Sequence, residues 1–154
     1  MSDRISEHVS FKEGIKSHTA TRLNIDNAPS SLDLINMKTI AEKVFEPLRK
    51  FVGGPIAINS FYRSPKLNSA IGGSTSSQHC KGCAFDIDDK YGYKTNAEMF
   101  KYIQCNLDYD QMIWEFGDVN NPDWVHVSYV SEEVNRRRCL IAYKEKGKTK
   151  YKQL

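Results

Sequence analysis

The longest regular pattern of apolar residues lies between residues 32 and 51 and has the period of an α-helix. Apolar side chains recur there at three- and four-residue steps, as on the buried side of an amphipathic helix. They are Leu34, Ile35, Met37, Ile40, Ala41, Val44, Phe45, Leu48 and Phe51. Pro47 predicts a kink, because proline has no amide hydrogen to donate to the preceding turn, and Gly53-Gly54 predicts the end of the helix.

Two further helices are indicated by capping boxes, in which a Ser or Thr and a Glu three residues later satisfy each other's backbone amides. The stretch "SFKE" at residues 10–13 predicts a short helix that begins near Phe11. The stretch "TNAE" at residues 95–98 predicts a second one that continues to about Leu107.

Strands are predicted where apolar and polar residues alternate, or where short apolar runs are bounded by turn residues. Four such stretches are "PIAINSFY" (55–62), "CAFDID" (83–88), "YDQMIWEFG" (109–117) and "DWVHVSYV" (123–130). Residues 63–82 are expected to form a loop, and residues 138–154 either a hairpin around Lys146–Lys148 or a frayed basic tail. Helices come first and strands later, which favours an α+β fold with a small, largely antiparallel sheet and helices packed on it.

Length and composition are those of one soluble globular domain, and we expect residues 1–154 to form a single one. The first 14 residues hold no apolar run typical of a signal peptide, so the chain is expected to be made in the cytoplasm. Nowhere is there an apolar stretch of membrane length, so no stable membrane insertion is expected.

The charge is uneven along the chain. The net charge is +3, but residues 132–154 hold eight lysines and arginines against three glutamates, which leaves the rest slightly acidic. This basic C-terminal extension indicates either an anionic partner, such as a cell-envelope polymer, or simply solubility. Nucleic acid is not expected as a partner, because no recognition motif accompanies the basic segment.

The stretch "SSQHCKGCAFDIDD", residues 76–89, concentrates side chains that bind metals. A closed structural zinc site needs four ligands, and Cys80-x-x-Cys83 is the one close cysteine pair, since Cys105 and Cys139 lie far apart. A redox pair would be expected at the start of a helix, where the thiolate is stabilised, whereas this pair precedes a strand. Both patterns fit poorly, and an open, hydrolytic metal site is the remaining interpretation.

An open site would use His79 and Asp86, which are seven residues apart. An odd separation on one strand places two side chains on opposite faces, so they converge only if the chain bends at Lys81–Gly82. A third ligand is needed, and His126 is the candidate, because its strand turns the neighbouring valines to the other face. Considered on its own, a single histidine on a strand is more often a solvent-facing residue than a metal ligand.

Three stretches together carry a resemblance to a known family: "YRSPKLNSAIGGSTSSQHCKGCAFDID", "WEFG" and "PDWVHVSY". They resemble the zinc peptidases that include D-Ala-D-Ala carboxypeptidases and phage L-alanyl-D-glutamate endopeptidases, whose α+β fold is shared with the hedgehog signalling domain. The matching core is Ser77, His79, Gly82, Ala84 and Asp86, followed by a later histidine on a strand.

The resemblance implies a zinc ion held by His79, Asp86 and His126. It also implies that an acidic residue three positions before the last histidine, here Asp123, is the general base. Glu115 in "WEFG" is the second candidate for that role, and the family spacing favours Asp123. Arg63 matches the arginine that polarises the scissile carbonyl. Cys80 and Cys83 have no role in this chemistry.

The function implied is hydrolysis of an amide bond in the peptide stems of bacterial peptidoglycan, by a monomer that acts at the cell wall as an endolysin or virion-associated lysin. Two alternatives remain open at this point. One is a D-Ala-D-Ala carboxypeptidase with the same chemistry, and the other is a non-catalytic metal-binding module of a virion.

Overall fold

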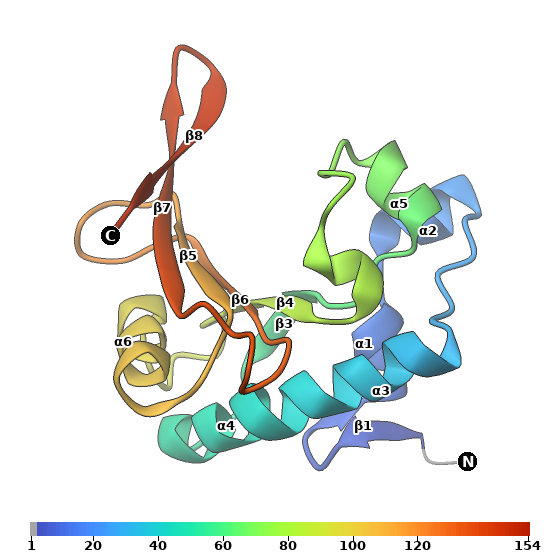
Figure 1. Ribbon diagram of the computed structural model, residues 1–154, viewed down its shortest axis with the longest axis horizontal. Helices are drawn as coiled ribbons and strands as arrows, with labels where there is room; N and C mark the ends of the chain where they lie inside the picture. Colours follow the sequence, from blue (N-terminus) through green and yellow to red (C-terminus); the bar gives the residue numbers. More distant parts are fainter. Residues whose placement is uncertain (1–2) are drawn as a thin grey trace.

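In the computed structural model, which describes residues 3–154, helices come first along the chain and most strands follow (Figure 1). The helices are α1 (Phe11–Ile15), α2 (His18–Leu23), α3 (Ser31–Ile40), the π-helical turn η1 (Ala41–Phe45), α4 (Glu46–Val52), α5 (Pro65–Ala70), the 3₁₀ turn η2 (Gln78–Lys81) and α6 (Asn96–Asn106). The strands are β1 (Arg4–Ser6), β2 (Val9–Ser10), β3 (Ala57–Ser60), β4 (Ala84–Asp88), β5 (Gln111–Glu115), β6 (Trp124–Ser128), β7 (Arg138–Glu145) and β8 (Lys148–Gln153).

The main sheet has six strands in the order β3-β4-β6-β5-β7-β8. Every neighbouring pair is antiparallel except β5 and β7, which run parallel. Strands β1 and β2 form a separate two-stranded hairpin. The predicted α+β class with a largely antiparallel sheet is therefore confirmed.

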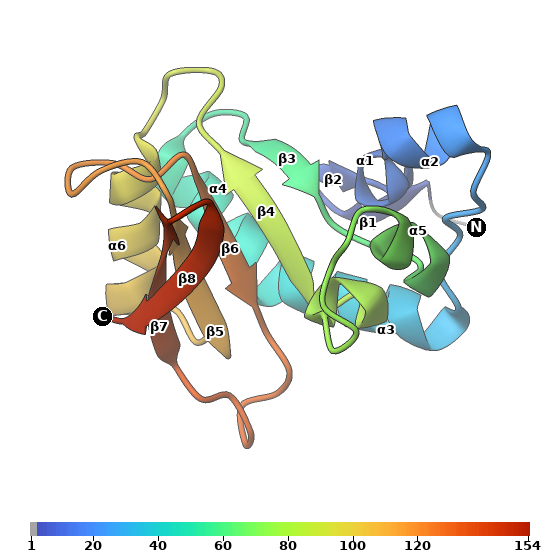
Figure 2. The same ribbon diagram turned by 90° about the horizontal axis from the view of Figure 1, so that it is seen from above.

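The two faces of the main sheet have different surroundings. On one face Phe85, Ile87, Val125 and Val127 are fully buried, together with side chains of α3, α4 and α6. Figure 2 looks onto the sheet with these helices behind it. Because side chains alternate between faces along a strand, Asp86 and His126 project from the face that these helices leave uncovered. The fold thus presents polar residues of the central strands on an open face.

The predicted long helix is present as a continuous run of α3, η1 and α4. Its irregularity begins a few residues before Pro47, in the π-helical turn Ala41–Phe45. Proline cannot donate to the carbonyl four residues earlier, and its ring crowds that carbonyl, so a wider turn just before it accommodates both effects. Gly53, with φ 78°, ends the run as predicted.

The capping boxes at Ser10 and Thr95 are both present, so the two predicted helix starts are confirmed. Residues 63–82, expected to be a loop, instead contain α5 and η2. The signal for α5 was in the sequence, because Ser64 caps the amide of Leu67 and Pro65 occupies the first helical turn, where proline is favoured.

The C-terminal segment forms a hairpin whose strands β7 and β8 pair over six positions. Lys146 and Gly147 make the turn with φ 52° and 76°, as a two-residue turn between twisted strands requires. The hairpin projects from one side of the molecule (Figure 1). Among residues 3–154, no helix is both long enough and apolar enough to cross a membrane.

Candidate metal centre

His79 is held in one tautomer with one ring nitrogen free. The residue lies in η2 and is 2% exposed. Its Nδ1 is 2.7 Å from the carbonyl oxygen of Phe61, and since a carbonyl can only accept, Nδ1 carries the proton. Nε2 is then the atom with the lone pair, and it is buried without a hydrogen-bond partner in the part of the chain that the structure describes. A buried, unpartnered nitrogen of this kind is suited to a metal ion.

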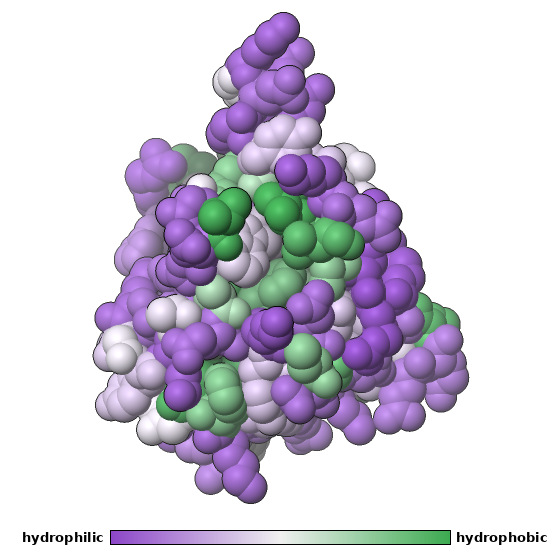
Figure 3. All heavy atoms as spheres, turned by 90° about the vertical axis from the view of Figure 1, so that its left-hand side faces the viewer, coloured by the Kyte–Doolittle hydropathy of each residue, from purple (hydrophilic) through white to green (hydrophobic). Residues whose placement is uncertain are grey.

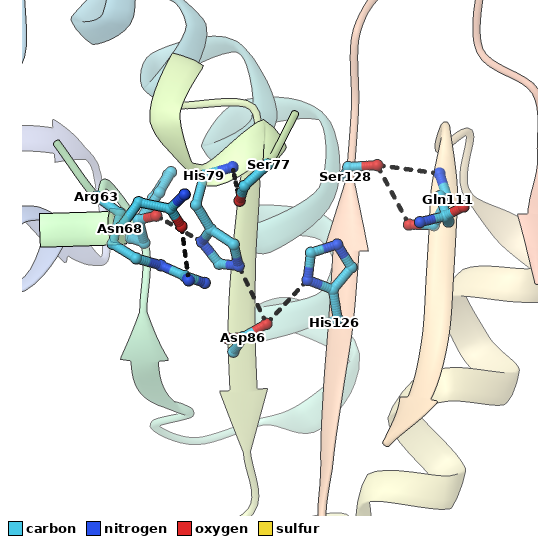
Figure 4. A network of polar contacts seen from close by, with 9 residues as sticks. Arg63, Asn68, Ser77, His79, Asp86, Gln111, His126 and Ser128 are labelled. Atoms are coloured by element: carbon cyan, nitrogen blue, oxygen red, sulfur yellow. Dashed lines mark hydrogen bonds and ion pairs between the residues drawn. The ribbon is translucent and has the colours of Figure 1, made fainter. Parts of the chain in front are cut away.

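Asp86 and His126 face each other across two neighbouring strands. They are directly opposed in the antiparallel register of β4 and β6, which places both side chains on one face. An oxygen of Asp86 is 3.0 Å from Nδ1 of His126 and 3.4 Å from Nε2 of His79. Figure 4 shows the two imidazole rings turned toward this carboxylate from opposite sides.

The bend predicted between His79 and Asp86 is confirmed at Gly82. This residue ends η2 with φ 73°, a conformation that glycine adopts without strain. A side chain there would also collide with the carbonyl oxygen of Asp33 in α3. The glycine therefore lets η2 pack against α3 and still deliver the chain into β4, which brings His79 over the sheet.

The electrostatics of the cluster favour the protonation states that metal ligands need. Burial lowers the pKa of His79, and although Asp86 acts in the opposite direction, His126 and Arg63 add to the lowering. Burial alone would raise the pKa of Asp86, but the electrostatic attraction of His79 and the hydrogen bond and charge of His126 outweigh it and hold that pKa well below its usual range. At neutral pH the cluster therefore offers a neutral His79 and an ionised carboxylate.

The three residues meet the requirements of a divalent cation site. One donor atom from each of His79, Asp86 and His126 lies within 4.8 Å of the other two. Two imidazole nitrogens and one carboxylate oxygen form a donor set that suits a catalytic zinc ion, with room left for a further ligand. The unpartnered Nε2 of His79 is the observation that distinguishes this cluster from an ordinary ion pair.

A second group of acidic and histidine side chains, at Glu7, His8 and Glu46, is explained without a metal. One Glu46 oxygen accepts from the Ser6 hydroxyl and from the amide of His8, and the other lies 2.6 Å from Nδ1 of His8. These bonds satisfy the carboxylate and fasten the β1–β2 hairpin to α4.

Glu115 lies on the same sheet face as the three ligands. In the register of β5 and β6 it is opposite Trp124, and Ile113 is opposite His126. The side chain is 8% exposed, and burial raises the pKa of its carboxyl to about 7, opposed by His126 and assisted by Asp86. A carboxyl that titrates near neutral pH beside a ligand cluster can both take up and return a proton.

Asp123 is placed differently. It is exposed and lies in a bend, immediately before the first residue of β6. Its backbone amide donates to the carbonyl of Glu115 at 2.8 Å, so its main chain continues the β5–β6 pairing. Among the described residues, its carboxylate makes no hydrogen bond or ion pair with the three ligands.

Arg63 lies beside the ligand cluster, in the segment that follows β3. Its guanidinium donates to the side-chain oxygen of Asn68 at 3.2 Å, and its charge contributes to the lowered pKa of His79. Its Nε is buried and finds no hydrogen-bond acceptor within residues 3–154. The guanidinium thus keeps donor capacity available for a ligand.

Two residues near the site were not anticipated. Asp110 is buried and accepts hydrogen bonds from Gln78, next to His79, and from the backbone and side chain of Arg136. It therefore ties η2 to the segment that leads into β7.

Tyr151 of β8 lies on the same sheet face as Glu115, because both residues are paired with Ala142 of β7. The position of Asp110 depends on long-range hydrogen bonds and that of Tyr151 on cross-strand register, and neither is visible along the chain.

The cysteine pair is not arranged for redox chemistry. Cys80 and Cys83 are free thiols, and burial raises the pKa of both. A raised pKa disfavours the reactive thiolate at neutral pH.

A wide groove of about 1060 Å³ lies elsewhere, between α6 and the β7–β8 hairpin. Its lining includes Phe100, Trp114 and Ile141, and Figure 3 shows apolar side chains gathered on this side of the molecule. None of the three candidate ligands lines it, so it is separate from the ligand cluster.

The family model described as Peptidase M15 matches residues 7–128. The matched span includes Arg63, the three candidate ligands and both candidate bases, and it excludes β7 and β8. No curated protein matches the chain.

Proposed function

The chain belongs to the peptidase M15 family, and from this premise we propose that it is a zinc-dependent peptidase that cleaves an amide bond in peptidoglycan stem peptides. Family membership makes it a peptidase, and peptidases of this family are zinc-dependent. The observation that carries the proposal to this chain is the cluster of His79, Asp86 and His126, with its buried and unpartnered Nε2.

In this proposal His79, Asp86 and His126 hold the zinc ion. A zinc ion bound there would act as a Lewis acid and would make a water molecule more acidic at neutral pH. The hydrogen bond from His79 to the Phe61 carbonyl fixes the ring orientation, as outer partners of metal-binding histidines commonly do. The opposed register of Asp86 and His126 fixes the other two ligands on rigid strands.

Glu115 is the residue that best fits the role of general base. It is buried and shares the face of the ligands, whereas Asp123 is exposed and lies in a bend outside β6. With a pKa raised to about 7, Glu115 accepts a proton from the attacking water and returns it to the leaving amine. Arg63 donates to the oxygen of the scissile carbonyl as negative charge develops there.

We further propose that the substrate bond is an internal one, as in L-alanyl-D-glutamate endopeptidases, and that the protein acts on the bacterial cell wall as an endolysin or virion-associated lysin. The support is the sequence resemblance of the motifs around His79 and His126. Fragments released from purified peptidoglycan distinguish this activity from that of a D-Ala-D-Ala carboxypeptidase, because only the carboxypeptidase releases free D-alanine.

The proposal is tested with four proteins: the wild type, His126→Ala, Glu115→Gln and Asp123→Asn. Zinc content and fragment masses from peptidoglycan are measured for each. The wild type is expected to bind one zinc ion and cut, and His126→Ala to lose both properties. Glu115→Gln should keep zinc and lose activity by about 10²–10⁴-fold, and Asp123→Asn should keep both. Loss of activity in Asp123→Asn alone would assign the base to Asp123 instead.

A further inference from the structure

A second hollow, which we call the basic pocket, opens on the β3 side of the ligand cluster. Its volume is about 410 Å³, in the range of sites that hold small ligands. Its lining includes Lys16, His18, Asn59, Ser60, Arg63 and Lys90. No aspartate or glutamate is part of that lining.

The basic pocket adjoins the candidate metal centre. Ser60 lies opposite Asp86 in the register of β3 and β4, so the pocket begins on the strand next to a metal ligand. Arg63 lines the pocket, and its backbone amide donates to the carbonyl oxygen of His79 at 3.1 Å. A substrate bound across the metal centre would therefore have part of its length within reach of the pocket.

The lysines and the arginine of the pocket have no ion-pair partner among residues 3–154. The ion pairs of residues 3–154 involve neither Lys16, Arg63 nor Lys90. The Nε of Arg63 is also buried without an acceptor. Three positive charges around one hollow repel one another, and an anion placed among them would relieve that repulsion and gain charge-assisted hydrogen bonds.

We propose that the basic pocket binds a free carboxylate of the substrate close to the scissile bond. The inference rests on the proposed function, because carboxylates are the anionic groups of a peptide. A stem peptide can supply one from two sources, its chain terminus and the free carboxyl group of a glutamate within the chain.

The test uses synthetic stem peptides in which one carboxylate at a time is converted to a carboxamide, at the chain terminus or at the glutamate. Values of kcat and KM are measured for the wild type, for the double variant Lys16→Ala/Lys90→Ala, and for Lys12→Ala. The control removes one positive charge, one turn before Lys16, at an exposed residue of α1 that does not line the pocket.

The wild type is expected to prefer the carboxylate form of one peptide pair by about tenfold or more, since charged hydrogen bonds have this strength. The double variant should lose most of that preference through a higher KM, and Lys12→Ala should keep it. The pair that shows the preference identifies which carboxylate the pocket holds. If the wild type cleaves the carboxylate and carboxamide peptides equally well, both for the chain terminus and for the glutamate, the pocket proposal is overturned. The proposed function would remain intact.

If no peptide is cut, binding of the same peptides to the zinc-loaded protein is measured by titration calorimetry. Tighter binding of a carboxylate form, lost in the double variant but not in Lys12→Ala, would support the pocket while the proposed function fails. Equal binding of carboxylate and carboxamide forms would overturn the pocket as well.

Discussion

Replacing Glu115 by glutamine is expected to change how the stability of the metal-free protein depends on pH. The carboxyl group is 8% exposed, and burial raises its pKa from 4.5 to about 7 against the opposing charge of His126. Glutamine has nearly the same shape and does not titrate, so the variant removes the ionisation and preserves the packing.

The sign of this pH dependence follows from the pH at which the native and the unfolded protein each release the proton of Glu115. Below about pH 4.5 the carboxyl is protonated in both states, and its contribution to stability is fully present. As the pH rises toward 7 the unfolded chain ionises while the native state keeps its proton, so this contribution is lost. A difference of about 2.5 pH units between the two states corresponds to about 3 kcal/mol. In a chain of this size that equals roughly 6–12 °C in Tm.

The assay measures the free energy of unfolding in urea for the wild type and Glu115→Gln. It is carried out in the presence of a chelator, at several pH values between about 4 and 8. The variant should gain about 3 kcal/mol relative to the wild type across that range. Asp123→Asn, at an exposed carboxylate on the same hairpin, is the control and should change stability by about 0.5 kcal/mol or less throughout. A difference between wild type and Glu115→Gln that stays constant with pH would refute the reasoning.

Three further changes have defined outcomes. Gly82→Ala should cost about 1–3 kcal/mol in thermal unfolding, because φ 73° and the nearby Asp33 carbonyl both exclude a side chain, and it should weaken zinc binding by displacing His79. Asp110→Ala should cost about 1–3 kcal/mol in urea unfolding, since the donors of Gln78 and Arg136 lose their acceptor; an unchanged midpoint would contradict that role. Neutralising the exposed hairpin lysines should weaken sedimentation with bacterial envelopes at low salt and have little effect at high salt, and equal losses at both would argue against an electrostatic interaction. The substitutions are Lys146→Gln, Lys148→Gln and Lys150→Gln.

The fold class could be predicted because its signals are local. The three- and four-residue spacing of apolar residues marks the long helix, and the capping boxes at Ser10 and Thr95 mark two helix starts. Helices α2 and α5 were missed because they are short and lack an apolar period. The parallel pairing of β5 with β7 was not predictable from the sequence, since it depends on how distant segments pack.

The three candidate metal ligands could be predicted from the sequence more fully than the general base could. The motif around His79 and the alternation around His126 identify ligand-type residues, and the glycine between His79 and Asp86 explains how the two meet. The two candidate bases illustrate what spacing along the chain cannot give. Spacing identifies Asp123 but says nothing of its exposure or of the bend in which it lies, whereas Glu115 reaches the face of His126 through register with a neighbouring strand.

The most direct test of the account is a zinc titration of activity. The protein is stripped with a chelator, zinc is returned in increments, and release of stem-peptide fragments from purified peptidoglycan is followed by mass spectrometry. The account predicts no cleavage by the stripped protein and full cleavage at one equivalent of zinc per chain. Cleavage that persists in excess chelator, or none at any zinc ratio, would contradict it.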